Sequence, residues 1–140
     1  DSCRLAARDR PKFYDHAIQA YQNSLAASDK IPPGMKSHAL MGLAYALEGS
    51  SDERGPLNQA VNHVLSVFYG RHLDLDQKQD PYWRGQSGLA ALRMLENQNQ
   101  YEQAIEICGE LEQAFPSMRE ALLLRRERLK KFLIKKPGLE

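Results

Sequence analysis

The chain has 140 residues, of which 42% are hydrophobic and 26% are charged, and its formal net charge is +1. These values predict one soluble globular domain over residues 1–140. They exclude a membrane span, because no apolar run approaches the about 20 residues that a bilayer-crossing helix needs. Cys3 and Cys108 are too few and too far apart to predict a disulfide framework or a metal motif.

The chain begins without an initiator Met or a signal peptide, so we expect a processed form or a piece of a longer protein. Its location stays open between the cell envelope or periplasm and the cytoplasm. The charge is unevenly placed: residues 119–136 hold eight basic and two acidic residues, and the rest holds 11 basic and 16 acidic residues. Such polarity bears on association with partners and not on fold.

Helix signals are frequent along the chain, whereas alternating β-branched runs are nearly absent. Apolar residues recur every three or four positions between breaks that are rich in Gly, Pro, Ser and Asp. This pattern predicts an all-α protein. The expected helices are about 2–9, 11–28, 35–48, 55–70, 81–97, 100–114 and 118–135.

Several helix ends have recognisable signals. Asp80 followed by Pro81 is typical of an N-cap with proline at the first helical position. Gly70 is a plausible helix stop, and Gly49 starts a segment that we expect to break the helix before it. Ser117 with Glu120 three residues later predicts a capping box for the last helix.

Short turns between these helices favour antiparallel neighbours, and therefore an antiparallel helical hairpin array. Gly42 in the third segment would allow a close helix crossing. A pattern that occurs twice supports the array: Tyr14-Asp15-His16-Ala17 near the start matches Tyr101-Glu102-Gln103-Ala104 near the end. Recurrence of such a unit is the sequence sign of a helical repeat.

The segment 88–116 resembles a tetratricopeptide repeat (TPR), a 34-residue helix–turn–helix whose second helix opens with Tyr-x-x-Ala. Tyr101, Ala104, Cys108, Leu111 and Pro116 stand at the expected places of that helix. The sequence around the repeat end is similar to repeats of bacterial envelope proteins, which would make this a bacterial TPR-like protein.

An earlier copy of the motif has Tyr14, Ala17 and Tyr21, and a degenerate middle copy has Gly42, Tyr45 and Ala60. The motif alanines are 43 and 44 residues apart, so each interval would carry an insertion. The resemblance implies about two and a half repeats followed by a C-terminal capping helix.

The resemblance also implies a function: a non-enzymatic protein–protein interaction module or scaffold that binds a peptide or helix of a partner in its concave surface. Groove positions of the middle repeat would include Ala39, Leu43, Ala46 and Leu47, although an apolar helix covered by its neighbours would show the same residues. The family's carboxylate clamp is not expected, because apolar residues stand at the clamp-like places. The groove residues that we expect to bind the partner are Lys36, Gln86, Arg93 and Asn97.

Two alternatives remain open. The basic last helix, with Arg125, Arg126 and Lys130, could bind nucleic acid or another anionic surface. The same cations could simply favour the C-terminal end of a solvated capping helix, and the lack of interleaved aromatic residues argues against single-stranded nucleic acid. Stacking of exposed array ends would give a self-associating structural protein, a homo-oligomer.

No catalytic, cofactor or metal motif stands out in the sequence. The four histidines show no paired ligand spacing, and Asp74-x-Asp76 lacks the glycine and the terminal glutamate of a calcium loop. Trp83 would suit an interface anchor, or it would pack where its helix begins. We therefore expect no enzyme, no cofactor and no metal site.

Overall fold

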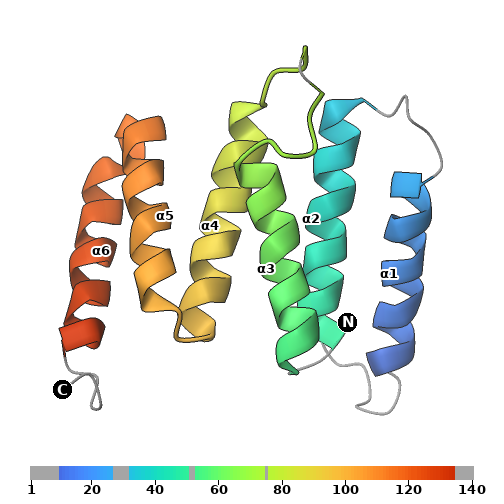
Figure 1. Cartoon of the computed structure of the whole chain (residues 1–140), viewed down its shortest axis with the longest axis horizontal. Helices are drawn as coiled ribbons and strands as arrows, with labels where there is room; N and C mark the ends of the chain where they lie inside the picture. Colours follow the sequence, from blue (N-terminus) through green and yellow to red (C-terminus); the bar gives the residue numbers. More distant parts are fainter. Residues whose placement is uncertain (1–9, 27–31, 51–52, 75, 135–140) are drawn as a thin grey trace. The chain divides into compact units, whose positions relative to one another are not determined.

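The computed structural model describes residues 10–26, 32–50, 53–74 and 76–134, and the helix expected over 2–9 lies outside them. Within the described residues all regular secondary structure is helical, which confirms the all-α prediction (Figure 1). The observed helix ends differ from the expected ones by at most two residues. The elements are α1 (Arg10–Ala26), α2 (Pro33–Ser50), α3 (Arg54–Phe68), α4 (Pro81–Asn97), α5 (Tyr101–Ala114), the 3-10 turn η2 (Pro116–Met118) and α6 (Arg119–Ile134).

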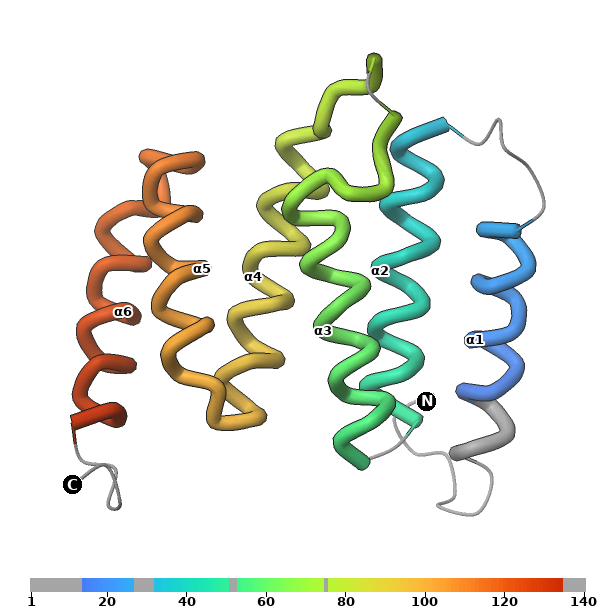
Figure 2. Tube along the Cα trace, viewed as in Figure 1, coloured from blue at the N-terminus to red at the C-terminus, as the bar shows by residue number. Residues whose placement is uncertain are grey.

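The chain forms two compact units, Asp1–Ser87 (unit 1) and Gly88–Glu140 (unit 2), and α4 contributes to both. In unit 1, α1 packs against α2 and α2 packs against α3, and successive helices run in opposite directions (Figure 2). In unit 2, α5 packs against α6. Consecutive antiparallel packing of this kind is that of the expected helical hairpin array.

The core of unit 1 is built mainly by α2 and α3. Met41, Leu43 and Ala44 of α2 are at most 3% exposed, and Val64 and Phe68 of α3 are at most 1% exposed. Met41 and Ala44 are three positions apart and Val64 and Phe68 are four apart, which are the spacings that place side chains on one helix face. The buried positions of α2 also include Leu43 and other residues around the helix, so α2 is covered on several sides.

The core of unit 2 contains the repeated motif residues. Ala104, Cys108 and Leu111 of α5 are fully buried, as are Ala91 and Leu92 of α4. The expectation that the motif positions serve packing is therefore confirmed in unit 2 for Ala104, Cys108 and Leu111, whereas Tyr101 is half-buried and Pro116 is exposed. In unit 1 it holds for Ala60, which is 1% exposed.

Two helix ends follow the sequence signals. Asp80 Oδ1 accepts a hydrogen bond of 2.9 Å from the backbone N–H of Tyr82, so Asp80 is the N-cap of α4. Gly70 has a positive φ of 71° after α3. Its N–H bonds to the Val67 carbonyl and the Arg71 N–H to the Ser66 carbonyl, which is the Schellman pattern that ends a helix.

We expect the segment 49–52 to break the helix before it, and α2 ends within this segment, at Ser50. Gly49 itself is still helical, and it packs closely against Tyr14 of α1. One expectation is wrong. The capping box at Ser117 does not form: Ser117 lies inside η2, and Phe115 at its N-cap position makes no side-chain cap hydrogen bond. Pro116 suits the first position of a helical turn, so the turn begins before Ser117.

None of the helices in the described part of the chain is both long enough and apolar enough to cross a membrane.

Candidate functional site

Unit 1 contains a pocket of about 350 Å³ between α1, α2 and the first turns of α4. This volume lies at the lower end of the range of small-ligand sites, roughly 300–1,000 Å³. Aromatic side chains dominate its lining, and we call it the aromatic pocket. It is lined by Tyr21, His38, Met41, Gly42, Tyr45, Tyr82, Trp83 and Gln86.

Helical spacing explains how these residues meet. His38, Gly42 and Tyr45 are separated by four and three positions, so they share one face of α2. Gln86 likewise follows Tyr82 by one turn of α4. The Asp80 cap fixes the first turn of α4 and thereby the backbone from which Tyr82 and Trp83 project.

The Trp83 ring meets two neighbouring rings at steep angles. Its centroid is 5.1 Å from that of Tyr82, with 80° between the ring planes, and 5.8 Å from that of His38, with 74° between the planes. Tyr82 is 61% exposed and Tyr45 is 43% exposed, so solvent reaches the pocket. Apolar bodies with polar tips make Tyr and Trp common at binding surfaces.

The aromatic pocket has no charged residue in its lining. The cation nearest in sequence, Arg84, has its guanidinium carbon 5.5 Å from the centre of the Phe68 ring of α3. The carboxylate of Asp80 caps the first turn of α4 at its exposed end. The lining therefore contains no Lys, Arg, Asp or Glu, and Asp80 stands at the start of the helix that carries Tyr82 and Trp83.

The four expected groove residues are divided between the two units. Gln86 lines the aromatic pocket, next to Trp83. Lys36 is half-buried on α2 and is not part of the lining, and Arg93 and Asn97 are exposed residues of α4 within unit 2.

The apolar positions of the middle helix are buried and cannot form a groove. Ala39 is 8% exposed, Leu43 3%, Ala46 5% and Leu47 7%. The expected groove of the middle repeat is wrong, and the alternative of an apolar helix covered by its neighbours is confirmed. The tyrosines that the sequence assigned to repeat packing, Tyr21 and Tyr45, turn out to line the pocket.

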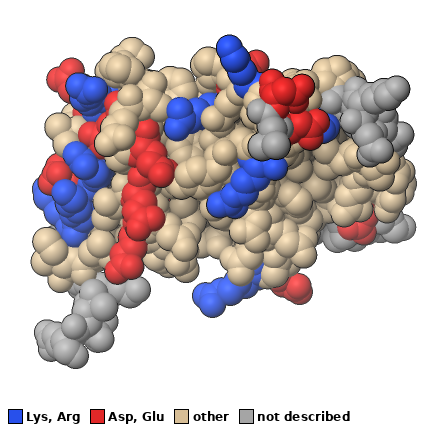
Figure 3. All heavy atoms as spheres, turned by 45° about the horizontal axis from the view of Figure 1, so that its top comes forward, with Lys and Arg blue, Asp and Glu red and all other residues tan. Residues whose placement is uncertain are grey.

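The three cations expected to bind anions pair with carboxylates of unit 2. Arg125 makes a two-point contact with Glu96, one arm of which is an Nε–Oε1 hydrogen bond of 3.1 Å. This hydrogen bond raises the pKa of Arg125. Acidic and basic side chains lie side by side over unit 2, at the left of the view in Figure 3.

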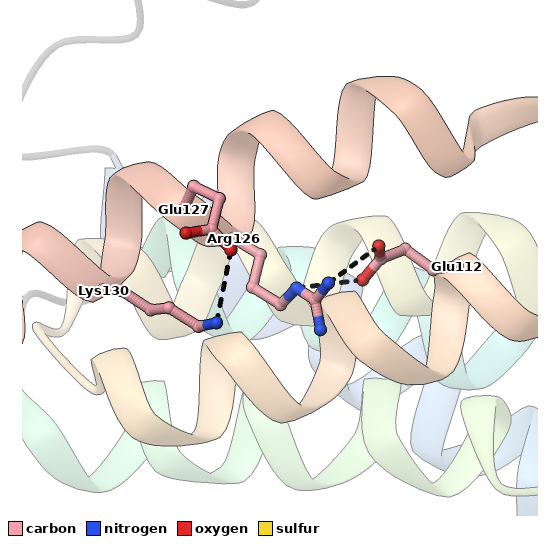
Figure 4. A network of polar contacts seen from close by, with 4 residues as sticks. All are labelled: Glu112, Arg126, Glu127 and Lys130. Atoms are coloured by element: carbon pink, nitrogen blue, oxygen red, sulfur yellow. Dashed lines mark hydrogen bonds and ion pairs between the residues drawn. The ribbon is translucent and has the colours of Figure 1, made fainter.

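The other two cations form a second group of contacts (Figure 4). Arg126 Nε lies 3.2 Å from Glu112 Oε2, and Glu112 is only 8% exposed. Lys130 Nζ lies 3.2 Å from Glu127 Oε1, and this pair is exposed. These internal pairs reduce the positive charge that α6 offers to an anionic partner.

Ser37 and His72 form a partly buried contact in unit 1, where Ser37 Oγ lies 2.7 Å from His72 Nε2. Burial lowers the pKa of His72, the Ser66 backbone raises it, and the Lys36 charge lowers it. A serine beside a histidine has the spacing of a nucleophile and its base. Ser37 is only 4% exposed, however, and His72 Nδ1 finds no partner in good hydrogen-bond geometry among the described residues. We interpret the contact as a tether between α2 and the loop after α3.

Cys108 is fully buried, and its burial raises the pKa of the thiol to about 11. Such a thiol stays protonated near neutral pH and is a poor nucleophile. In the parts of the chain that the structure describes, no three His, Cys, Asp or Glu side chains come together in a way that would hold a metal ion.

Comparison of the chain with protein-family models, curated proteins and solved structures finds no match in any of the three.

Proposed function

We propose that the chain is a non-enzymatic protein–protein interaction module that binds an extended or helical segment of a partner at unit 1. The observation that carries the proposal is the aromatic pocket, where three tyrosines and a tryptophan surround a hollow open to solvent. Half-exposed aromatic side chains that remain on a rigid helical scaffold are the usual anchors of protein recognition.

The lining also provides hydrogen-bonding groups for a peptide backbone. Gln86 offers an amide, Tyr21 and Tyr82 offer hydroxyl groups and Trp83 offers an indole N–H. Because both α2 and α4 hold the pocket through packed or capped helical turns, binding would need little rearrangement. The TPR resemblance points to the same class of function, since those arrays bind peptides.

The anionic-surface alternative is weakened by the ion pairs of Arg125, Arg126 and Lys130. An anionic partner that bound these cations would have to displace the carboxylates with which they already form ion pairs.

Selection from a displayed random-peptide library tests the proposal. We expect the wild-type protein to enrich a family of related peptides, and Tyr82→Ala with Gln86→Glu to lose binding to them. The control is Leu124→Ala, a substitution at a 70% exposed apolar residue of unit 2, which should retain binding. Enriched peptides that bind the pocket variant as well as the wild type would contradict the proposal.

A further inference from the structure

We propose that the aromatic pocket takes a cationic side chain, lysine or arginine, of the bound partner segment. The inference rests on the proposed function and deepens it by naming the chemistry of the anchor. A cation placed over the face of Trp or Tyr is attracted by the quadrupole of the ring. The pocket has three Tyr and one Trp in its lining and no Phe.

The ring geometry favours a cation over a flat apolar group. Tyr82 and His38 meet Trp83 with interplanar angles of 80° and 74°. Rings at nearly right angles form the corner of a box, so that a compact cation in the corner lies near more than one ring. Stacked parallel rings would instead suit a flat or extended ligand.

The charges around the pocket also favour a cationic ligand. The lining contains no Lys or Arg that would repel a cation, and Arg84 is turned onto the Phe68 ring instead. The N-terminus of α4 would by itself favour an anion. The carboxylate of Asp80 already occupies that position and hydrogen-bonds to the Tyr82 N–H. Asp80 therefore places a negative charge at the start of the helix that carries Tyr82 and Trp83.

The sole tryptophan of the chain makes this testable, because Trp83 fluorescence reports on the pocket alone. The probes are a short peptide with one central arginine and the same peptide with citrulline, which has nearly the same shape without the charge. We expect saturable fluorescence changes and at least about fivefold tighter binding of the arginine peptide. A lysine peptide compared with its norleucine analogue should show the same preference.

Two substitutions of Tyr82 provide matched controls, because Tyr82 is 61% exposed and its replacement should leave the fold intact. Tyr82→Phe keeps the ring and should keep the preference for arginine. Tyr82→Leu keeps an apolar side chain without the ring and should bring the two affinities close together. Circular dichroism would check that both variants are folded.

Equal affinity for the arginine and citrulline peptides in the wild type would overturn the inference, as would tighter binding of an oligoproline than of either peptide. The peptide selection separates this failure from failure of the proposed function. Enriched peptides without a cationic residue that still need Tyr82 would leave the proposed function intact and refute the cationic anchor. A selection without enrichment, together with no fluorescence response, would refute both.

Discussion

The ring of Tyr21 on α1 packs so closely on Gly42 of α2 that a β-carbon on the glycine would stand 2.3 Å from Cζ of the ring. The same relationship recurs at Gly49, where a β-carbon would stand 2.5 Å from Cζ of Tyr14. The two tyrosines are seven residues apart on α1 and the two glycines are seven residues apart on α2, which is about two helical turns in each helix. Because the two helices are antiparallel, the first tyrosine meets the second glycine. The two glycines, which have no side chain, thus leave room for two tyrosine rings. One of these tyrosines, Tyr21, also lines the aromatic pocket.

Gly42→Ala should therefore destabilise unit 1. Displacing the ring costs about 1–3 kcal/mol in a tightly packed site, whereas alanine gains at most about 1 kcal/mol in helix propensity. We expect a net loss in the free energy of unfolding, measured by urea titration with Trp83 fluorescence. Gly109→Ala in α5 is the control, because nothing lies within 4 Å of its added β-carbon. It should leave stability unchanged or raise it, and a stabilising Gly42→Ala would contradict the packing argument.

The helices were predictable from sequence because each depends on local periodicity and on its own end signals. Asp80 and Gly70 act through the backbone of their own helix, so their effects could be inferred directly. Ser117 was misread because its role depends on context: it follows a proline that starts the turn earlier. The packing of Gly49 against a tyrosine of another helix likewise could not be inferred from its own helix.

The site could be predicted only in part, because it depends on which helices meet. Gln86 and Trp83 were singled out in the sequence, but Tyr21 and Tyr45 matched repeat packing positions and gave no sign of lining a pocket. The basic charge pattern of α6 suggested anion binding, but it did not show that carboxylates elsewhere in the chain pair with these cations. The partners of Arg125 and Arg126 lie 29 and 14 residues earlier in the chain.

Arg126→Met should destabilise unit 2, because it leaves the carboxylate of Glu112, which is 8% exposed, without its partner. An unsatisfied buried polar group costs about 1–3 kcal/mol, and more when charged. Lys130→Met removes the exposed pair with Glu127 and should change stability by less than about 0.5 kcal/mol. Urea unfolding followed by circular dichroism compares the two. Adding Glu112→Gln to Arg126→Met should recover part of the loss, and equal effects of the two Met variants would contradict this account.

Cys108 should react slowly with thiol reagents in the folded protein. With a pKa of about 11, roughly a thousandth of the thiol is ionised at pH 8, against about a quarter in an unfolded chain with a pKa near 8.5. A Cys3→Ser variant isolates the signal of Cys108. We expect labelling by an aromatic disulfide reagent to be at least about 100-fold slower in buffer than in concentrated urea. Similar rates in the two conditions would show that the thiol is accessible and ionised in the folded state.

Unit 1 should lose stability as the pH falls below about 6.5. Burial lowers the pKa of both His63 and His72 relative to the unfolded chain. Between the folded pKa and about 6.5 the unfolded state therefore binds more protons, so stability is fully present above this window and declines on acidification.

Urea midpoints followed by Trp83 fluorescence between pH 8 and pH 5 measure this loss. His72→Gln should reduce the slope, since glutamine does not titrate, and His16→Gln, at an exposed histidine of α1, is the matched control variant. Ser37→Ala should lower stability at pH 8, where Ser37 Oγ and the neutral His72 ring are hydrogen-bonded at 2.7 Å. A pH slope that is unchanged in His72→Gln would assign the acid sensitivity to His63 or to carboxylates, and it would remove His72 from this explanation.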